Sequence, residues 1–324
     1  MWLKLMTTEV KSAYLYPGQG LAPKDIIDCH DKLKNVSLDL TQNRIGFAQD
    51  VLNKVYGAKA FNIAATLKDK DSPNFKMTSF VQTVVYTLSV ITSEIMRAQN
   101  PARAKPNFVA GHSLGEYSAL TEAGVVEFKN GIEIVTFRGL VMQEACQDNP
   151  SSLVSINGLN EELVKDKVCQ QTGAEIALIN APTLIVVGVS KEGVVDIEKL
   201  ANEAGARRVS VLPTAGAFHT KRFMQEASSK LAEFTAPYEF SDPQIPFVPN
   251  LTGEPSFSRT ALKNHLPESM VNPVRWAKGL QFMRDTDVRL FVEVGPGTSL
   301  ASLNKINGIP EEQTINALDQ LLAA

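Results

Sequence analysis

The sequence predicts an α/β fold with a largely parallel sheet, into which a smaller α/β unit is inserted. Three observations support this prediction. Apolar runs that end at glycine- or proline-containing turns alternate with helical patterns in the first half of the chain. A Gly-x-Ser-x-Gly motif lies between one of these runs and a helix-forming segment. Further on, residues 150–212 follow the order βαββαβ, which is that of ferredoxin-like units.

The first half of the chain supplies the elements that lead to this motif. An apolar run at residues 13–16 stops at Pro17-Gly18-Gln19-Gly20, which predicts a buried strand ending in a tight turn. Helical patterns follow at residues 47–56 and 80–97. A loop at 101–106 and a strand at 108–110 come next. In a parallel sheet of this kind, ligands collect at the carboxyl ends of the strands.

The inserted unit has short strands and amphipathic helices. Strands are predicted at 153–156, 176–179, 184–187 and 207–212, and helices at 161–171 and 194–204. A further α/β section follows, with helices at 221–235 and 276–285, a proline-rich stretch at 243–249 and a strand at 290–294. The expected domains are therefore a large one, residues 1–149 and 213–324, and a small inserted one, residues 150–212.

Ser113 is the residue with the clearest chemical role. It is the centre of Gly111-His112-Ser113-Leu114-Gly115, directly after a predicted strand and before a helix at residues 116–123, with Gly124 at the expected C-cap. A serine on such a turn projects its hydroxyl out of the backbone, and a Cβ at either flanking glycine would clash with neighbouring chain. The pattern indicates acyl transfer through Ser113; the alternative is a tight structural turn.

Composition argues against several other classes of protein. The net charge of −3 comes from 32 basic and 35 acidic residues spread along 324 residues, which gives no bulk attraction for nucleic acid or an anionic membrane. Cys29, Cys146 and Cys169 are widely spaced, so neither disulfides nor a zinc site are expected. The apolar start at residues 1–6 is too short for a signal peptide, and no run reaches the ~20 apolar residues of a membrane span. We expect a cytoplasmic protein.

A serine nucleophile needs a base, and the chain has four histidines. His30 lies in a charged stretch, and His265 is expected in a polar loop. His112 is adjacent to the serine on the turn, where neighbouring side chains diverge, and is expected to line the pocket or to pack. His219 follows the predicted strand 207–212 and precedes a helix, which would place its ring on the same edge of the sheet as the serine. It is the predicted base; the alternative is a helix-capping histidine.

Arg138 lies within the apolar face of a helix predicted at residues 131–147. A guanidinium in that position must be paired. One possibility is an ion pair with a carboxylate of the protein; the other is a carboxylate of the substrate, held by two charge-assisted hydrogen bonds. Because this helix follows the helix after Ser113 closely, the two should pack together. A dicarboxylic acyl group would then have one end at Ser113 and the other at Arg138.

Seven motifs, in the same order and across nearly the whole chain, resemble those of malonyl-CoA:acyl-carrier-protein transacylases, including the free-standing acyltransferases that serve polyketide synthases in trans. They are Tyr16-Pro17-Gly18-Gln19-Gly20, Gly111-His112-Ser113-Leu114-Gly115-Glu116-Tyr117-Ser118, Arg138-Gly139 with Met142-Gln143, Asn180-Ala181-Pro182, Gly216-Ala217-Phe218-His219, Asn272-Pro273-Val274-Arg275-Trp276 and Glu293-Val294-Gly295-Pro296-Gly297. The resemblance implies an α/β-hydrolase-like large domain with an inserted ferredoxin-like small domain.

The resemblance also implies roles for individual residues. Ser113 and His219 form a dyad without a carboxylate, and a backbone carbonyl at the position of Ser269 orients the histidine ring. The backbone N–H groups of Gln19 and Leu114 form the oxyanion hole. The activated serine attacks the thioester of malonyl-CoA, and the phosphopantetheine thiol of an acyl carrier protein then attacks the malonyl-serine in a ping-pong reaction. No metal or redox cofactor takes part.

Substrate choice in this family is linked to the residue before the histidine. Polyketide acyltransferases with phenylalanine there tend to take malonyl units, so Phe218 indicates malonyl and favours polyketide over fatty-acid synthesis. A bulky ring beside the acyl α-carbon leaves little room for a methyl branch. The chain departs from the family pattern at Leu21-Ala22-Pro23, where relatives have Ser-Gln and a glycine, and in the unusually polar region 24–43. These departures concern the entrance beside Gln19 rather than the dyad.

The expected partners are malonyl-CoA and a phosphopantetheinylated acyl carrier protein, and we expect a monomer. Carrier proteins of this kind usually present an acidic helix. Candidate docking residues are therefore Arg207-Arg208, Lys221-Arg222 and Arg275 with Lys278, unless these are ordinary solvated surface. Two other functions stay open: an acyl hydrolase that clears acyl groups from carrier proteins, and a non-catalytic docking scaffold. Arg138 argues against the hydrolase, because beside an apolar acyl chain it would be an unpaired charge.

Overall fold

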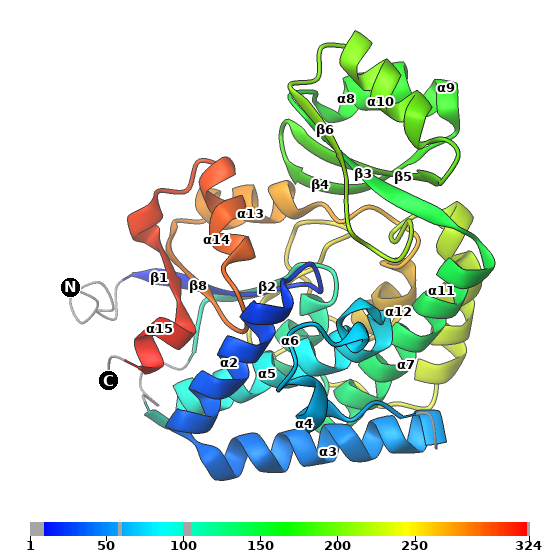
Figure 1. The fold of residues 1–324 in the computed structure, drawn as a ribbon. Coiled ribbons are helices and arrows are strands. Elements are labelled where there is room, and N and C mark those ends of the chain that lie inside the picture. The colour runs from blue at the N-terminus through cyan, green and yellow to red at the C-terminus, as the bar shows by residue number, and fades with distance from the viewer. Residues whose placement is uncertain (1–9, 58–59, 100–104, 323–324) are drawn as a thin grey trace.

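The computed structural model describes residues 10–57, 60–99 and 105–322. Two sheets organise this part of the chain, a five-stranded one in the lower part of Figure 1 and a four-stranded one in the upper part. The expectation for residues 1–6, and that for most of the loop at 101–106, lie outside the described residues. Within the described ranges, no helix is long and apolar enough to cross a membrane.

The five-stranded sheet is parallel throughout, in the order β7-β2-β1-β8-β9. Its central strand, β1 (Lys11–Tyr16), pairs with β2 (Phe108–Gly111) on one side and with β8 (Val288–Glu293) on the other. The short strands β7 (Phe247–Val248) and β9 (Thr314–Asn316) form its edges. Because helices cover both faces, β1 and β8 carry nearly continuous buried runs rather than an alternation of buried and exposed residues.

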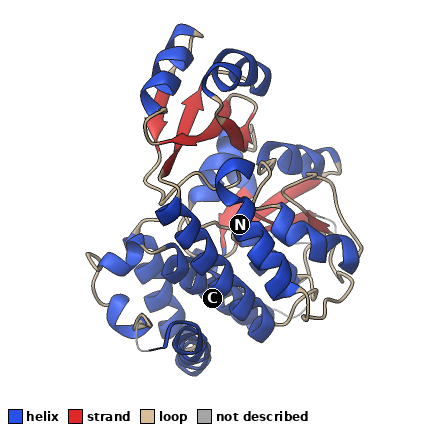
Figure 2. Cartoon of the chain, turned by 90° about the vertical axis from the view of Figure 1, so that its right-hand side faces the viewer, coloured by secondary structure: helices blue, strands red, loops and turns tan. Residues whose placement is uncertain are grey.

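Helices surround this sheet on both faces (Figures 1 and 2). They are α2 (Pro23–Val36), α3 (Leu38–Tyr56), α4 (Ile63–Thr66), α5 (Thr78–Gln99), α6 (Gly115–Glu122), α7 (Phe128–Asp148), α11 (Lys221–Thr235), α12 (Arg259–Glu268), α13 (Trp276–Asp285), α14 (Ser299–Ile306) and α15 (Ala317–Leu321), with the 3-10 turns η2 (Pro73–Lys76) and η5 (Glu311–Gln313). Helix α5 is buried along most of its length and packs against α7. The helix that carries Arg138, α7, therefore packs directly against the buried helix α5.

The four-stranded sheet is antiparallel, in the order β4-β5-β3-β6. Its elements are β3 (Ser151–Asn157), α8 (Glu161–Val164), a π-type turn η4 (Lys165–Cys169), α9 (Gln170–Thr172), β4 (Glu175–Ala181), β5 (Leu184–Ser190), α10 (Val194–Glu203) and β6 (Arg208–Val211). The predicted order βαββαβ is present, and the unit has an apolar core of its own. It is joined to the rest of the chain by a parallel bridge in which the Ile179 N–H donates to the Val274 carbonyl at 2.8 Å.

Three regions differ from the sequence predictions. Helix α2 forms in the polar region 24–43, where no element is predicted; only Ile26, Cys29 and Leu33 are buried, so the apolar stripe is narrow. The sequence predicts His265 in a polar loop, and this is wrong: it lies in α12, where an otherwise polar helix buries a single face. Residues 314–321, for which the sequence predicts no element, form β9 and α15. The three cysteines are buried and free.

Candidate active site

The turn between β2 and α6 is tight and holds Ser113 in an unusual conformation. The φ of Ser113 is +52°, in the left-handed region that residues with a Cβ rarely adopt. A Cβ on Gly111 would lie 1.9 Å from the carbonyl carbon of Gly115, and one on Gly115 would lie 2.0 Å from the carbonyl oxygen of Tyr16. The predicted clashes at the two glycines are therefore confirmed. The turn is pressed against the end of β1.

His219 lies against this serine. Its Nε2 is 2.6 Å from Ser113 Oγ, and its Nδ1 is 2.7 Å from the carbonyl oxygen of Ser269. Because a carbonyl can only accept, Nδ1 carries the proton and Nε2 is free to accept one from the serine. His219 is 3% exposed; burial, followed by the charge of Arg138, lowers its pKa to about 3. The ring contacts no carboxylate among the described residues.

His219 reaches the serine from a different part of the fold than the sequence predicts. The strand before it, β6, belongs to the smaller sheet and ends at Val211, so His219 does not follow a strand of the parallel sheet. It lies on the connection that returns to α11, with φ +61°. The helix-capping alternative is not supported, because the first N–H groups of α11, those of Lys221 and Arg222, donate to the carboxylate of Glu175.

Arg138 extends from α7 to the same serine. Its Nη2 is 3.3 Å from Ser113 Oγ, and its Nη1 donates to Gln82 Oε1 at 2.7 Å. The side chain is 1% exposed, and its Cζ lies 5.4 Å from the centre of the Tyr117 ring. In the part of the chain that the structure describes, Nε has no hydrogen-bond partner and no carboxylate forms an ion pair with Arg138. Burial lowers the pKa of Arg138. The internal ion pair considered from the sequence is thus absent there.

Two backbone N–H groups, those of Gln19 and Leu114, lie in the turns beside the serine, and neither donates a hydrogen bond to a described residue. Gln19 lies in the turn after β1, and Leu114 in the turn after β2; the two strands end in register, with Tyr16 opposite Gly111. Both amides are therefore available to an oxygen atom of a ligand.

The remaining predicted residues line the surroundings of the dyad. His112 points away from the serine: its Nε2 donates to Asn180 Oδ1 at 2.8 Å, and its ring meets Trp276 edge-on at 5.4 Å. Burial lowers the pKa of His112. Phe218, next to His219, is 4% exposed.

Four residues that sequence reasoning missed also belong to this region. Gln82 connects Arg138 to Gln19, because its Nε2 donates to the Gln19 Oε1 at 2.7 Å. Asn250 binds the backbone of the serine turn, and the buried pair of Glu116 and His265 lies behind it. Glu116 was part of a quoted motif, but the others are isolated polar residues whose partners lie far away in the sequence.

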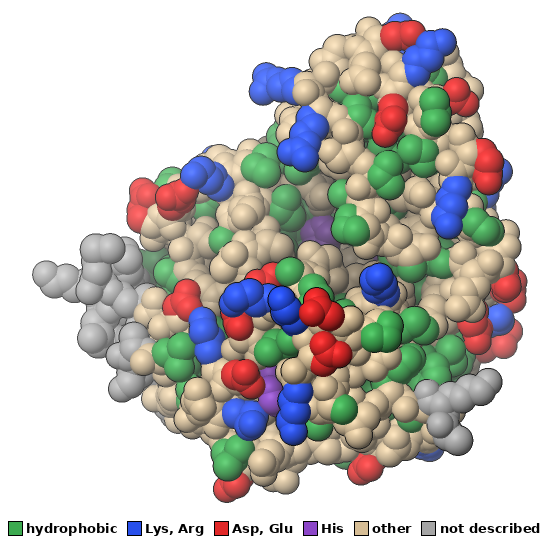
Figure 3. Space-filling model, viewed as in Figure 1, with side chains coloured by type: hydrophobic (Ala, Val, Ile, Leu, Met, Phe, Trp, Pro, Cys, Tyr) green, Lys and Arg blue, Asp and Glu red, His purple; other side chains and the backbone are tan. Residues whose placement is uncertain are grey.

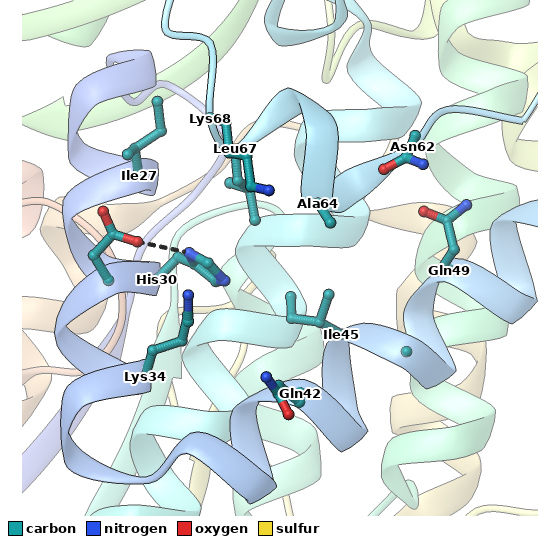
Figure 4. Close-up of a pocket in the computed structure, with 12 residues that line it drawn as sticks. Ile27, His30, Lys34, Gln42, Ile45, Gln49, Asn62, Ala64, Leu67 and Lys68 are labelled. Carbon is teal, nitrogen blue, oxygen red and sulfur yellow. Dashed lines mark hydrogen bonds and ion pairs between the residues drawn. The ribbon is translucent and has the colours of Figure 1, made fainter.

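Figure 3 shows a hollow between the upper and lower parts of the molecule, with a histidine at its floor. A second cavity, of about 660 Å³, lies between α2, α3 and the segment around α4 (Figure 4). His30 and Lys34 of α2 face it, and the His30 ring is hydrogen-bonded to Asp31. It shares no lining residue with the dyad or Arg138 and is separate from the candidate site.

Comparison with known proteins agrees with this geometry. The family model described as "Acyl transferase domain" matches residues 37–314. The chain is 31% identical over 293 residues to the polyketide biosynthesis protein ThaF of Burkholderia thailandensis, in a match that spans 90% of this chain but 24% of ThaF. It is 28% identical over 309 residues to the malonyl CoA-acyl carrier protein transacylase of Bacillus subtilis, covering 91% of this chain and 90% of that protein.

Solved structures give the same result. An acyl-carrier-protein S-malonyltransferase from Burkholderia pseudomallei superposes with a TM-score of 0.83 at 28% identity, over 97% of this chain and all of that one. A malonyl-transacylase in complex with a type II PKS acyl-carrier protein superposes with a TM-score of 0.81 at 27% identity, over 97% of this chain and 99% of that one. The protein therefore belongs to the acyl transferase domain family.

Proposed function

We propose that this protein moves a malonyl group from malonyl-CoA to the phosphopantetheine thiol of an acyl carrier protein. The observation that carries the proposal is Arg138, a buried guanidinium 3.3 Å from the nucleophile with no carboxylate paired to it among the described residues. A buried positive charge is unfavourable unless it is paired with a negative group. The distal carboxylate of a malonyl group can supply that negative charge. The names of the related transacylases support the same substrate.

In the first half-reaction, Arg138 binds the malonyl carboxylate while the thioester carbonyl lies over Ser113. His219 accepts the proton of Ser113 Oγ through Nε2, and Oγ attacks the thioester carbon. The amides of Gln19 and Leu114 donate to the oxyanion that forms. The carbon–sulfur bond then breaks, and the CoA sulfur leaves with the proton held by His219. The product is malonyl-Ser113.

In the second half-reaction the same groups work in reverse. The phosphopantetheine thiol of the carrier gives its proton to His219 and attacks the ester carbonyl of malonyl-Ser113. The oxyanion forms again at the two amides, and the carbon–oxygen bond to Ser113 breaks as the serine recovers a proton from His219. Because the ring is oriented by the Ser269 carbonyl, no carboxylate is needed to hold it.

The domain organisation is part of this proposal. We assign an α/β-hydrolase-like large domain to residues 1–149 and 213–324, and a ferredoxin-like small domain to residues 150–212. The antiparallel order β4-β5-β3-β6 and the separate apolar core support the second assignment. A cytoplasmic location stays a prediction, which fractionation of the native host would test.

We favour a polyketide pathway over fatty-acid synthesis. Phe218, buried next to the base, supports a malonyl unit without a methyl branch. The similarity to a polyketide biosynthesis protein, and to a transacylase solved with a type II PKS carrier, points the same way.

Among the candidate docking residues, Arg275 and Lys278 are already paired with carboxylates, whereas Arg207-Arg208 and Lys221-Arg222 are exposed and form no ion pair with a described residue; of these two pairs we test the first. Lys278 already lies 2.9 Å from the Glu254 carboxylate, and Arg275 lies 3.5 Å from that of Glu161. The two arginines at the start of β6 are exposed and form no ion pair with a described residue. Charge reversal at both, with K278E as the control, should weaken transfer to the carrier and leave acylation by malonyl-CoA unchanged; unchanged transfer would remove this pair from the docking surface.

Intact-protein mass spectrometry tests the function directly. Brief incubation with malonyl-CoA should add one malonyl group, which moves to a phosphopantetheinylated carrier protein when that is added. S113A should form no adduct. R138A should lose malonylation by about 100-fold or more and still accept acetyl-CoA, because only the charged acyl group uses the guanidinium. Acetyl or medium-chain adducts that pass to water instead of the carrier would favour the hydrolase.

A further inference from the structure

The side chain of Asn250 forms two hydrogen bonds with the backbone of the serine turn. Its Oδ1 accepts the Ser113 N–H at 2.8 Å, and its Nδ2 donates to the Gly111 carbonyl at 2.7 Å. Asn250 is 3% exposed and lies two residues beyond β7, which pairs with β2, the strand that leads into the turn. The side-chain amide of Asn250 therefore binds both neighbours of His112, Gly111 and Ser113. One of these, Ser113, has the left-handed φ of +52°.

Asn250 is itself fixed by a buried acid. Its N–H donates to Glu116 Oε1 at 2.7 Å, and the same oxygen accepts the Nε2–H of His265 at 2.8 Å. Glu116 is 0% exposed and His265 is 5% exposed. The second carboxylate oxygen, Oε2, has no partner among the described residues. Burying a carboxylate with one oxygen unpaired is unfavourable. A role for Glu116 beyond packing would account for it.

We propose that Asn250 is a positioning residue for the nucleophile, and that Glu116 and His265 act through it by fixing its backbone. The inference rests on the proposed role of Ser113 as the nucleophile. The Ser113 N–H and the Gly111 carbonyl belong to the two peptide groups on either side of His112, the residue before the nucleophile. The two hydrogen bonds of Asn250, which we call the clamp, therefore fix the backbone that carries Oγ of Ser113 and, one residue further on, the Leu114 N–H. Glu116, Asn250 and His265 form a hydrogen-bonded network that leads from α12 to the serine turn.

This network is held by other hydrogen bonds than the group that binds the substrate carboxylate. Arg138 lies on α7 and is held by Gln82, and among the described residues neither forms a hydrogen bond with Asn250. Loosening the clamp should therefore slow the chemical step and leave malonyl-CoA binding nearly unchanged. A purely structural role would lower thermal stability without this separation of kcat from KM.

The test compares four variants. N250A should lower kcat for malonyl-Ser113 formation by about 100-fold, with KM within about threefold of wild type. H265L, which removes the donor to Glu116, should lower kcat by about 10-fold; H265Q, whose amide nitrogen can take the place of Nε2, should recover most of that loss. N304A is the matched control, because Asn304 is equally buried but lies on α14 and bonds to Thr314. It should lower the melting temperature and keep kcat.

A second readout separates this inference from the proposed function. A fluorophosphonate labels an activated serine whatever its acyl substrate, with loss of fluoride. If wild type is labelled at Ser113 but takes no malonyl group, the proposed function fails and the labelling rates of the variants still test the clamp. Equal labelling and equal kcat in wild type, N250A and H265L would overturn the clamp. A wild type labelled by neither reagent would overturn both.

Discussion

His219 is kept neutral by its surroundings, and this decides when it can act as a base. Burial, and secondarily the charge of Arg138, lower its pKa to about 3. The Nε2 lone pair is therefore present throughout the range in which an ordinary histidine, with a pKa of about 6.5, becomes protonated. A malonyl carboxylate on Arg138 would offset the neighbouring charge. Substrate binding would then make His219 a stronger base at the moment when the serine proton must be removed.

The pH dependence of acylation follows from this pKa. We expect kcat/KM for malonyl-Ser113 formation to change by less than about twofold between about pH 5 and about pH 8, because the free enzyme keeps its base neutral throughout. Rapid-quench mass spectrometry at each pH measures it. A histidine with its usual pKa would instead lose about 30-fold at pH 5, and that result would contradict the low pKa of His219.

At the scale of elements, the serine turn depends on how closely β2 and α6 approach β1. Gly115 lies against the Tyr16 carbonyl. A methyl group on residue 115 would therefore clash with backbone atoms of β1, which cannot shift as easily as the end of a side chain. Gly46 offers the opposite case: it is exposed on α3, with no atom within 4 Å of its added Cβ.

These two glycines make a matched pair of substitutions. G115A should destabilise the protein by on the order of 3 kcal/mol and abolish acylation, because β1 and the turn must separate. G46A should stabilise it by up to about 1 kcal/mol, since alanine favours a helix interior. Urea unfolding of both variants measures the effect. A G115A protein with wild-type stability and activity would mean that the turn can relax without cost.

Residues and elements with a strong local signal could be predicted from the sequence. The helices α11 and α13 follow their predicted bounds, and Ser113, His219 and Arg138 lie together, since each stands out in its own segment. Helix α2 could not be predicted, because its few buried residues are hidden among polar ones. The pair of Glu116 and His265 spans 149 residues. Only the folded topology shows that these two polar residues meet, so no local pattern could reveal the clamp on Ser113.

At the scale of the whole molecule, the site is assembled from distant parts of the chain. Ser113 comes from the parallel sheet, His219 from the connection that returns from the smaller sheet, and the Ser269 carbonyl from the end of α12. The dyad therefore exists only when both sheets are folded. Groups buried in this process acquire altered pKa values, and these couple global stability to pH.

Glu293 and His219 act on stability in opposite directions. Burial raises the pKa of Glu293 from 4.5 to about 7, although its carboxylate accepts the N–H groups of Leu300 and Ala301 at the start of α14. Between these values the folded protein holds a proton that the unfolded chain has lost, so stability falls as pH rises through this window. His219, with its lowered pKa, makes the unfolded chain bind the proton first, so its contribution rises with pH up to about 6.5.

Replacing Glu293 isolates its part of this balance. We expect the free energy of unfolding of E293Q, relative to wild type at the same pH, to rise by on the order of 1 to 3 kcal/mol from about pH 5 to about pH 8, because glutamine does not titrate. The His219 contribution is the same in both proteins and cancels. Urea unfolding at several pH values measures the difference, with the exposed substitution E192Q as the control. If the difference between E293Q and wild type stays constant across this range, the Glu293 carboxylate does not carry a raised pKa in the folded protein.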